Sequence, residues 1–594
     1  MADQSMADPG LMTRWGKAVD PEHVLEEYPR PGMVRDNFMI LNGRWDYAIS
    51  GSEQFPREYD GKILVPFSPE APLSGAGRIL HPGEFLHYER PVRITVKENV
   101  RYLLHFGAVD QSCRVYVNGR KAGSHTGGYL PFSIDLSGFL QDGENRIHVT
   151  VRDLSDTSFH AKGKQSLDRG GMWYTPQSGI WQTVWLEKVP VRYIRELKID
   201  PDLDERSVRV KVLLNTGENI PVRFSVRFRG RKLLAAEGMT GISQKVSPLL
   251  LYPWTPETPD LYDLSVQTDE DCVLSYFAMR KISVEKDSRG ILRLFLNNRP
   301  YYQNGVLDQG YYPDGLYTAP SDEAMVNDIL RMKELGFNML RKHIKIEPSR
   351  WYWHCDRLGM LVWQDMVCGG EPYRGWFVTV MPNLLPFTGR VIRDRYRKLF
   401  SREEEDGRKE FLREVRQTVR HLYNHPSIVL WTAFNEGWGQ FDARKVTELI
   451  HRADPSRPVD EASGWFDQGG GEIFSIHNYF RRLKLPSRSD RCIALTEFGG
   501  YSYRVPHHTW NEEEYGYGKY RSKEELTEAV GSLWKRDLLR NIPKGLSASV
   551  YTQVSDVEDE TNGLMTYDRE EIKVDREKMI KINRDLLTVF ERSL

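Results

Sequence analysis

The C-terminal half of the chain alternates short apolar segments with helix-length amphipathic ones, and this pattern most constrains the fold. Such alternation is typical of βα units, in which a buried parallel strand is followed by a covering helix. Eight segments are apolar and turn polar at their C-terminal ends: residues 301–308, 337–344, 360–366, 427–436, 457–464, 473–480, 492–498 and 546–556. The expected helices are residues 322–335, 348–358, 407–422, 442–452, 523–539 and 576–590. We therefore predict a (β/α)8 TIM barrel over residues 287–594, with its active site at the C-terminal ends of the strands.

The preceding residues read as two all-strand domains. In residues 1–189, short segments alternate apolar and polar side chains between turn signals, and the Asn118-Gly119 pair predicts a tight hairpin. This spacing predicts an N-terminal jelly-roll β-sandwich that resembles sugar-binding modules. Residues 190–286 are again all strand, which predicts a small immunoglobulin-like β-sandwich. The fold class is therefore multidomain: jelly roll, immunoglobulin-like sandwich and barrel.

The composition restricts the kinds of binding partner that we expect. Lys plus Arg number 82 against 83 for Asp plus Glu, so no basic surface is indicated for nucleic acid, and a neutral ligand is favoured. No window approaches the roughly 18 apolar residues of a membrane span, and the first residues carry no apolar leader, so we expect a cytoplasmic protein that does not bind membranes. The five cysteines are scattered without CxxC spacing, which predicts neither disulfides nor a zinc site. We expect no metal and no cofactor.

Two glutamates end predicted barrel strands. Glu436, in Phe-Asn-Glu-Gly, closes the fourth strand, and Glu497, in Thr-Glu-Phe-Gly-Gly, closes the seventh. A single glutamate at such a place is more often part of a structural ion pair, but two at one end of a barrel are the minimum equipment for cleaving a glycosidic bond. Carboxyl groups about 5–5.5 Å apart would give retention of configuration, and a separation of about 6.5–9.5 Å would give inversion.

Other polar side chains fall at strand ends beside these glutamates. Asn435 is placed to position a sugar 2-hydroxyl, Arg341 to keep a carboxylate ionised, and Tyr479 to donate a hydrogen bond to it. His343 and His477 are further candidates for substrate binding, although histidines at a barrel rim often only pack or cap.

Substrate hydroxyls and ring faces need further partners. Aromatic rings stack on the apolar faces of sugars, so one or two members of the following set should touch substrate while the others belong to the core: Trp363, Trp438, Trp465, Trp510 and Tyr551. Five further polar side chains could form hydrogen bonds to sugar hydroxyls, or could find their hydrogen-bond partners within the barrel itself: Asp308, Gln364, Asp365, Gln553 and Asp556. The aromatic loop Val505–Lys519 is either a wall of the substrate site or a surface that packs on another subunit.

The domain order and several motifs resemble glycoside hydrolase family 2, which includes β-galactosidases, β-glucuronidases and β-mannosidases. The motifs are Leu41–Trp45 (LNGRW), Gly127–Leu136 (GGYLPFSIDL), Ser178–Glu187 (SGIWQTVWLE) and the two glutamate segments. The resemblance implies that Glu436 is the general acid/base, Glu497 the nucleophile, Asn435 the 2-hydroxyl ligand and Tyr479 the partner of the nucleophile. It also implies a retaining exo-enzyme without cofactor, a β-glycoside substrate and a possible homo-oligomer.

Departures from the family pattern bear on the substrate. Lys342-His343-Ile344 does not reproduce the usual RxSHYP, and Asp308-Gln309 replaces a GxNxHE-like segment. The family's glucuronidases share an Asn-x-Lys pair that binds the sugar carboxylate, whereas the matching place here reads Asp559-Glu560-Thr561-Asn562, an acidic run that would repel a uronate. In the family's large β-galactosidases the first domain can lend an acid to the site, and Asp153 or Asp156 lies in a comparable place.

The sequence thus favours a β-galactosidase. A β-glucuronidase, β-mannosidase, β-galactofuranosidase or α-L-arabinopyranosidase stays open within the class. The alternative from another class is a non-catalytic carbohydrate-binding protein, against which the intact set of Asn435, Glu436 and Glu497 argues.

Overall fold

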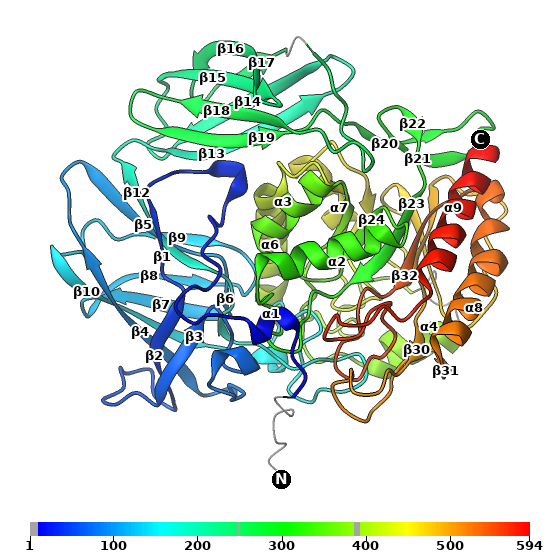
Figure 1. Cartoon of the computed structure of the whole chain (residues 1–594), viewed down its shortest axis with the longest axis horizontal. Helices are drawn as coiled ribbons and strands as arrows, with labels where there is room; N and C mark the ends of the chain where they lie inside the picture. The colour runs from blue at the N-terminus through cyan, green and yellow to red at the C-terminus, as the bar shows by residue number, and fades with distance from the viewer. Residues whose placement is uncertain (1–9, 248–249, 385–391) are drawn as a thin grey trace.

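The computed structural model describes residues 10–247, 250–384 and 392–594, and it is built of three parts (Figure 1). The N-terminal domain lies on the left of the view, the second all-strand domain at the top, and the barrel on the right. The short helices outside the barrel and its insertions are α1 (Arg14–Lys17), η1 (Pro31–Met33), η2 (Pro72–Ser74) and η3 (Ser155–Thr157).

The N-terminal domain packs a six-stranded antiparallel sheet on a four-stranded one. The larger sheet runs β3 (Gly61–Val65), β2 (Gly43–Ser50), β4 (Phe85–Ile94), β10 (Gly143–Arg152), β7 (Ser112–Val117) and β8 (Arg120–Thr126). The smaller one runs β1 (Phe38–Ile40), β12 (Val184–Pro190), β5 (Val100–Phe106) and β9 (Phe132–Asp135), and a short pair joins β11 (Gly179–Ile180) to β6 (Val109–Asp110). The predicted hairpin is confirmed, because Asn118 and Gly119 take φ of 50° and 77° between β7 and β8.

The second domain packs a three-stranded sheet on a four-stranded one. These are β13 (Ile194–Asp202), β14 (Ser207–Leu214) and β17 (Ser243–Val246), and β16 (Arg231–Met239), β15 (Pro221–Phe228), β18 (Tyr262–Gln267) and β19 (Cys272–Phe277). Side chains of β15 alternate between buried and less buried positions, as expected for a strand with one face on a core. The jelly-roll and immunoglobulin-like connections and the domain boundaries stay predictions.

A hairpin of β20 (Ile282–Lys286) and β21 (Leu292–Leu296), extended by β22 (Arg299–Pro300), spans the boundary placed at residue 286. Leu294 and Leu296 belong to the apolar cluster that Leu307, Met339 and other barrel residues form. The hairpin therefore packs against the barrel core.

Eight parallel strands form the nearly closed barrel that the sequence predicts. They are β23 (Gln303–Asp308), β24 (Met339–Lys342), β25 (Leu361–Asp365), β26 (Ile428–Thr432), β27 (Val459–Asp460), β28 (Ile473–Asn478), β29 (Cys492–Gly499) and β32 (Leu546–Thr552). Hydrogen-bonded pairing runs continuously from β27 through β23 and β32 to β28, so the sheet opens only between β27 and β28. A second pair, β30 (Tyr501–Tyr503) with β31 (Gly518–Tyr520), follows β29.

Helices at the predicted places cover the barrel. They are α2 (Asp322–Glu334), α3 (Ser349–Leu358), α6 (Glu405–Leu422), α7 (Ala443–Ala453), α8 (Lys523–Leu533) and α9 (Arg576–Arg592). Shorter turns are η4 (Trp376–Val380), α4 (Met381–Leu384), η5 (Trp534–Leu539) and η6 (Ile542–Lys544). Local signals explain these bounds: the Ser321 hydroxyl caps α2 by accepting from the Ala324 N–H, and acidic residues occupy its first turn.

A loop of the N-terminal domain reaches the C-terminal ends of the barrel strands. The Lys162 N–H donates to the Cys368 carbonyl, and Ala161 forms a bridge with Gly369. A Cβ on Gly369 would stand 2.4 Å from the His160 carbonyl oxygen, so only glycine permits this approach. The barrel site is therefore bordered by a second domain.

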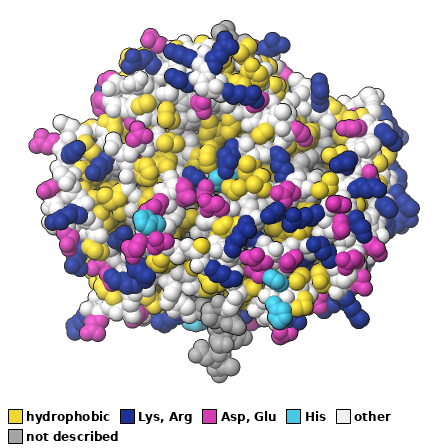
Figure 2. Space-filling model, viewed as in Figure 1, with side chains coloured by type: hydrophobic (Ala, Val, Ile, Leu, Met, Phe, Trp, Pro, Cys, Tyr) yellow, Lys and Arg dark blue, Asp and Glu magenta, His cyan; other side chains and the backbone are white. Residues whose placement is uncertain are grey.

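Charges of both signs are interspersed over the face seen in Figure 2, as the net charge of −1 leads one to expect. Among the described helices, none is both long and apolar enough to cross a membrane.

Candidate active site

Two glutamates and a histidine meet at the C-terminal ends of β26, β28 and β29. One ligand atom from each of Glu436, His477 and Glu497 can be chosen so that all three atoms lie within 4.8 Å of one another. Residues distant in the sequence are brought together because parallel strands of a barrel all end at the same rim.

Glu497 is a buried and fully partnered carboxylate. Its Oε1 accepts from Arg341 Nη1 at 3.0 Å, and its Oε2 accepts from the Tyr479 hydroxyl at 2.5 Å. Burial alone would raise its pKa, but the adjacent His477, the positive charge of Arg341 and the Tyr479 hydrogen bond outweigh burial and lower the pKa of Glu497 to about 2. Glu497 is therefore ionised at neutral pH.

Arg341 is the electrostatic centre beneath the rim. Its Nε and Nη2 donate to the two oxygens of Asp365 at 3.0 Å each, and its Nη1 also reaches the Thr496 carbonyl at 3.1 Å. His343 Nδ1 lies 2.9 Å from Asp365 Oδ2, and burial lowers the pKa of His343 to about 4. A neutral His343 that donates from Nδ1 to Asp365 keeps Nε2 as an acceptor.

Asn435 has one half of its amide fixed and the other free. Its Oδ1 accepts from Arg341 Nη2 at 2.8 Å, and because arginine only donates, this contact decides which way the amide points. Its Nδ2 is buried and has no partner among the described residues. A buried donor without a partner costs about 1–3 kcal/mol, so a substrate acceptor at this place would relieve it.

The backbone at Glu436 is held in an uncommon conformation. Glu436 has φ of 50° and Gly437 φ of 78°, both in the left-handed region. The Glu436 N–H donates to the Ser463 carbonyl at 2.9 Å, and Asn435 bridges to the same residue. Glu436 Oε1 lies 2.8 Å from His477 Nδ1. The turn thus directs Glu436 to His477 and Asn435 to Arg341.

The predicted aromatic residues pack against different neighbours. Trp465 meets the His477 ring edge-on at 5.2 Å, and Trp438 packs on Trp173 of the N-terminal domain at 5.2 Å. Trp510 contacts Tyr567 at 5.7 Å. The indole N–H groups of Trp438, Trp465 and Trp510 are buried without a partner in the described part of the chain, which leaves three donors available to a ligand.

The loop Val505–Lys519 packs within its own chain. Tyr517 stacks on Tyr479 at 4.0 Å, and the Asn511 amide donates to Asp559 at 2.6 Å. The loop therefore borders the rim beside Glu497, as the first of its two predicted roles requires.

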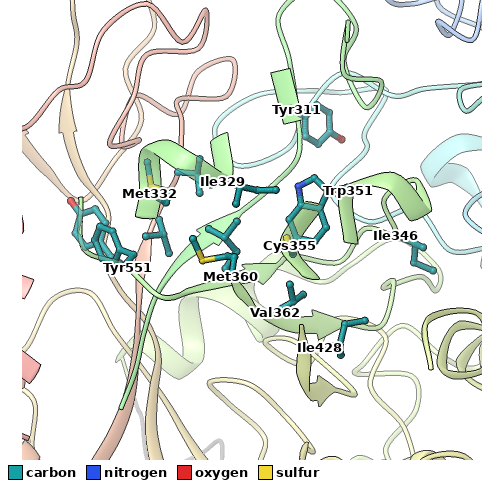
Figure 3. Close-up of a cluster of buried hydrophobic side chains, with 14 of the residues drawn as sticks. Tyr311, Ile329, Met332, Ile346, Trp351, Cys355, Met360, Val362, Ile428 and Tyr551 are labelled. Carbon is teal, nitrogen blue, oxygen red and sulfur yellow. The ribbon is translucent and has the colours of Figure 1, made fainter. Parts of the chain in front are cut away.

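Two predicted substrate ligands, Asp308 and Tyr551, are engaged with other residues of the fold, and their contact with substrate stays a prediction. Asp308 Oδ2 accepts from Lys342 at 2.7 Å and its Oδ1 from the Gly310 N–H, so it belongs to a buried ion network with Glu347. Tyr551 is buried between Phe498 and Trp534 and lies among the core side chains shown in Figure 3. The carboxylate of Asp308 is thus ion-paired, and the ring of Tyr551 is packed in the core.

The remaining candidate residues, Gln553, Asp153, Asp156 and Trp363, are hydrogen-bonded to other residues of the chain. Gln553 donates from Nε2 to Asn562 Oδ1 at 2.7 Å, and only its buried Oε1 lacks a partner in the described structure. Asp153 and Asp156 have hydrogen-bond partners within the N-terminal domain: Asp153 accepts from Ser155 and Ser178, and Asp156 from Ser166. Trp363 donates to Gln303 inside the barrel and is core.

Lys164, on the loop of the N-terminal domain, is a residue that the sequence analysis missed. It is 6% exposed, and its Nζ lies 4.0 Å from Glu560 Oε2, beyond a hydrogen bond. Its ammonium lies over the rings of Tyr174 and Trp438. No hydrogen bond donated by its Nζ is found within the described residues. No sequence motif indicates that Lys164 lies near the active site, because the loop that carries it meets the barrel only in the folded chain.

The three-residue cluster has the donor set of a cation site, but its atoms are already engaged. Glu497 is paired with Arg341 and Tyr479, and Glu436 with His477. A positively charged arginine at one of the three ligands disfavours a metal there. The arrangement is suited to acid–base and nucleophilic chemistry.

Comparison with known proteins places two separate parts of the chain in one family. The model described as "Glycosyl hydrolases family 2, sugar binding domain" matches residues 76–190, and "Glycosyl hydrolases family 2, TIM barrel domain" matches residues 291–483. A β-galactosidase of Leuconostoc mesenteroides is 27% identical over 408 residues, 64% of this chain and 35% of that protein. A putative β-glucuronidase of Formosa agariphila is 27% identical over 491 residues, 73% of this chain and 52% of that protein. The chain thus spans about a third to a half of the length of these relatives.

Solved structures share the fold. A β-glucuronidase of an uncultured Clostridium superposes with a TM-score of 0.72 at 17% identity, covering 93% of this chain and 99% of that one. A family 2 β-galacturonidase of Eisenbergiella tayi, bound to galacturonate, gives 0.70 at 18% identity, covering 94% and 99%.

Proposed function

Because the chain belongs to glycoside hydrolase family 2, we propose that it is a retaining exo-β-glycosidase that releases terminal non-reducing sugars, with β-galactosides as the first candidate substrates. Relatives at about a quarter identity carry the names β-galactosidase and β-glucuronidase, which supports a β-glycoside substrate and leaves the sugar open.

The closeness of Glu436 and Glu497 carries the proposal. An oxygen of each carboxyl group lies within 4.8 Å of the other. This supports the short separation of retaining enzymes rather than the wider gap of about 6.5–9.5 Å that accommodates a water between the carboxyl groups.

The environments divide the roles. Glu497, ionised and held by Arg341 and Tyr479, attacks the anomeric carbon while Glu436 gives its proton to the departing glycosidic oxygen. Glu436 then takes a proton from water, whose oxygen replaces Glu497 at the same carbon, so the configuration is retained. The free Nδ2 of Asn435 donates to the sugar 2-hydroxyl, where hydrogen bonds strengthen in the transition state.

Lys164 favours a second candidate, a β-uronide. The acidic run is expected to repel a uronate, but two basic residues of the N-terminal domain lie beside it and oppose this repulsion. Lys164 lies 4.0 Å from Glu560, and Arg169 lies 3.7 Å from both Glu558 and Asp559. A buried ammonium without a hydrogen bond gains most from an anionic acceptor. This supports glucuronides or galacturonides beside neutral galactosides.

Hydrolysis of p-nitrophenyl glycosides tests the proposal. The panel comprises β-galactopyranoside, β-glucuronide, β-galacturonide, β-mannoside, β-glucoside, β-galactofuranoside and α-L-arabinopyranoside. We expect turnover of one sugar that falls by on the order of 10³-fold or more in Glu497→Ala and, for poor leaving groups, strongly in Glu436→Ala. Proton NMR of the first product should show the same anomeric configuration as the substrate, which is the β-anomer for the β-glycosides. A wild-type protein inert on every member, or a first product of inverted configuration, would overturn the proposal. Lys164→Met distinguishes the two candidate substrates: it should lower kcat/KM for a uronide at least tenfold more than for a galactoside.

A further inference from the structure

A cavity of about 210 Å³ lies where the N-terminal domain meets the outer helices of the barrel. The segment before β1 lines one side of it with Leu25 and Pro29, and strands β5, β9 and β12 of the smaller sheet line another. The barrel contributes α2, the start of α3 and the last turn of α6, and α6 lies beside that sheet in Figure 1. Neither of the two glutamates of the candidate active site lines this cavity, so the two places are separate.

A second cavity, of about 390 Å³, adjoins the first and extends to the second all-strand domain. That domain lines it with Leu197 of β13 and Tyr276 of β19. Four residues line both cavities and form the neck between them: Arg30, Pro131, Ser349 and His421. The neck residues belong to the segment before β1, the N-terminal domain, α3 and α6. All three domains therefore meet around one continuous space.

Three of the neck residues carry polar groups that have no partner in the described structure. Neither the ring of His421 nor the hydroxyl of Ser349 makes a hydrogen bond there. Arg30 makes its hydrogen bonds from Nη2, at 2.6 Å to each oxygen of Glu187, and its buried Nε has no partner. A few polar groups that converge on a largely apolar pocket are the usual means by which proteins orient a ligand.

The charges that line the two cavities are balanced. Most of them form ion pairs: Arg30 with Glu187, Arg350 with Asp322, and Arg420 with Glu196. The remaining two, Glu27 in the first cavity and Arg195 in the second, have opposite signs. An anionic or cationic ligand therefore gains little from this lining, and a neutral ligand is favoured.

The polar groups of the neck match hydroxyl groups. Burial lowers the pKa of His421 to about 3, so its ring is neutral and offers one donor and one acceptor. Arg30 offers donors only, and the Ser349 hydroxyl can donate and accept. A ligand with several hydroxyls can meet all three requirements at once. The first cavity has room for a six-membered ring, since about 150 Å³ is enough to hold benzene.

We propose that the neck and the two cavities form a second binding site, which takes a neutral mono- or disaccharide and bonds its hydroxyls to Arg30, Ser349 and His421. Apolar walls such as Leu25, Pro29 and Pro131 pack against the C–H faces of its ring. The site goes beyond the proposed hydrolysis and does not depend on which sugar the barrel cleaves. A sugar bound there contacts the N-terminal domain and the barrel together, so it should stabilise their junction.

Equilibrium dialysis of the full chain with radiolabelled D-galactose, D-glucose and maltose tests the proposal, with D-glucuronate as the charged comparison. We expect saturable binding of at least one neutral sugar. His421→Leu keeps a similar volume and removes both ring nitrogens, and Ser349→Ala removes only the hydroxyl. Each variant should weaken this binding by about tenfold, as expected for the loss of one hydrogen bond.

Arg416→Leu is the matched control. Arg416 is an exposed residue of the same helix, α6, and it lines neither cavity, so its replacement should leave sugar binding unchanged. Thermal unfolding without sugar checks the fold of each variant. His421→Leu should be at least as stable as the wild type because it removes a polar group that has no partner. Ser349→Ala covers the case in which His421→Leu does not fold.

Three results would overturn the proposal: no saturable binding of any neutral sugar, tighter binding of D-glucuronate than of every neutral sugar, or binding that His421→Leu and Ser349→Ala leave unchanged. Binding that Glu497→Ala abolishes and His421→Leu does not would place the sugar in the barrel, with the same consequence. A wild type that binds a neutral sugar through His421 but hydrolyses no glycoside would support this site and overturn the proposed function, so the two failures are distinguishable.

Discussion

The hydrogen bond from Tyr479 to Glu497 gives the sharpest test of the site. The Tyr479 hydroxyl lies 2.5 Å from Glu497 Oε2 and 3.1 Å from the Thr552 hydroxyl. Tyr479→Phe removes only the hydroxyl and keeps the ring that stacks on Tyr517. The expected consequence is a change in how firmly Glu497 holds its negative charge.

The size and sign of the effect follow from the geometry. A hydrogen bond to a charged group is worth about 1.5–3 kcal/mol, and one pKa unit corresponds to about 1.4 kcal/mol, so its loss should raise the pKa of Glu497 by about one to two units. The folded-state pKa of Glu497 is lowered to about 2, so activity that needs the carboxylate is present above this value and is lost as the pH falls through it. In the variant the acid limb of kcat/KM should therefore move up, to between about pH 3 and 4.

The assay is kcat/KM between pH 3 and 8, with enzyme diluted from pH 7 and returned there to confirm that it has not denatured. Tyr517→Phe is the control, because Tyr517 stacks on the same ring but makes no hydrogen bond to Glu497 within the described structure. The reasoning is refuted if the acid limb of Tyr479→Phe coincides with that of wild type, or if Tyr517→Phe moves it equally.

Two further substitutions probe positioning and packing. Gly464 has φ of 88°, and a Cβ there would stand 2.6 Å from the His477 ring. Gly464→Ala should therefore displace His477 and lower kcat for substrates with poor leaving groups by on the order of 10- to 100-fold. Steady-state kinetics with a thermal-unfolding check test this, and kinetics equal to those of the wild type would show that the ring has room to move. Tyr551→Phe should leave kcat and KM within about twofold because the ring faces the core; a KM raised tenfold would return Tyr551 to the substrate site.

The sequence predicted the barrel and its glutamates because both leave local signals. Eight apolar segments ending in polar residues define strands whose ends must meet, and the Asn435-Glu436 and Glu497 segments fall at two of these ends. Proximity of Glu436, Glu497, Arg341 and Tyr479 then follows from topology alone, without knowledge of any side-chain contact.

The sequence could not show which way the side chains of Asp308 and Tyr551 point, and the physical reason is the same for both. Side chains alternate between the two faces of a strand, but strands of a parallel barrel are buried on both faces, so apolar pattern does not reveal which residues point inward. Thr552 reaches Tyr479 at the rim, and its neighbour Tyr551 therefore points outward into the helical layer. In the same way Arg341 points into the site and Lys342 outward to Asp308.

The charge at the rim is decided between two domains. From sequence, the acidic residues Asp559 and Glu560 form an uninterrupted negative segment that excludes a uronate. In the folded chain, the N–H of Gly171 donates to Asp559, Tyr174 donates to Glu560, and Lys164 adds a buried positive charge 4.0 Å from Glu560. Hydrogen bonds and a nearby cation weaken the field of a carboxylate most where water is excluded. We therefore expect the choice of sugar to depend on the loop of the N-terminal domain as well as on the barrel, so that a change confined to Lys164 should alter this choice without altering the two glutamates.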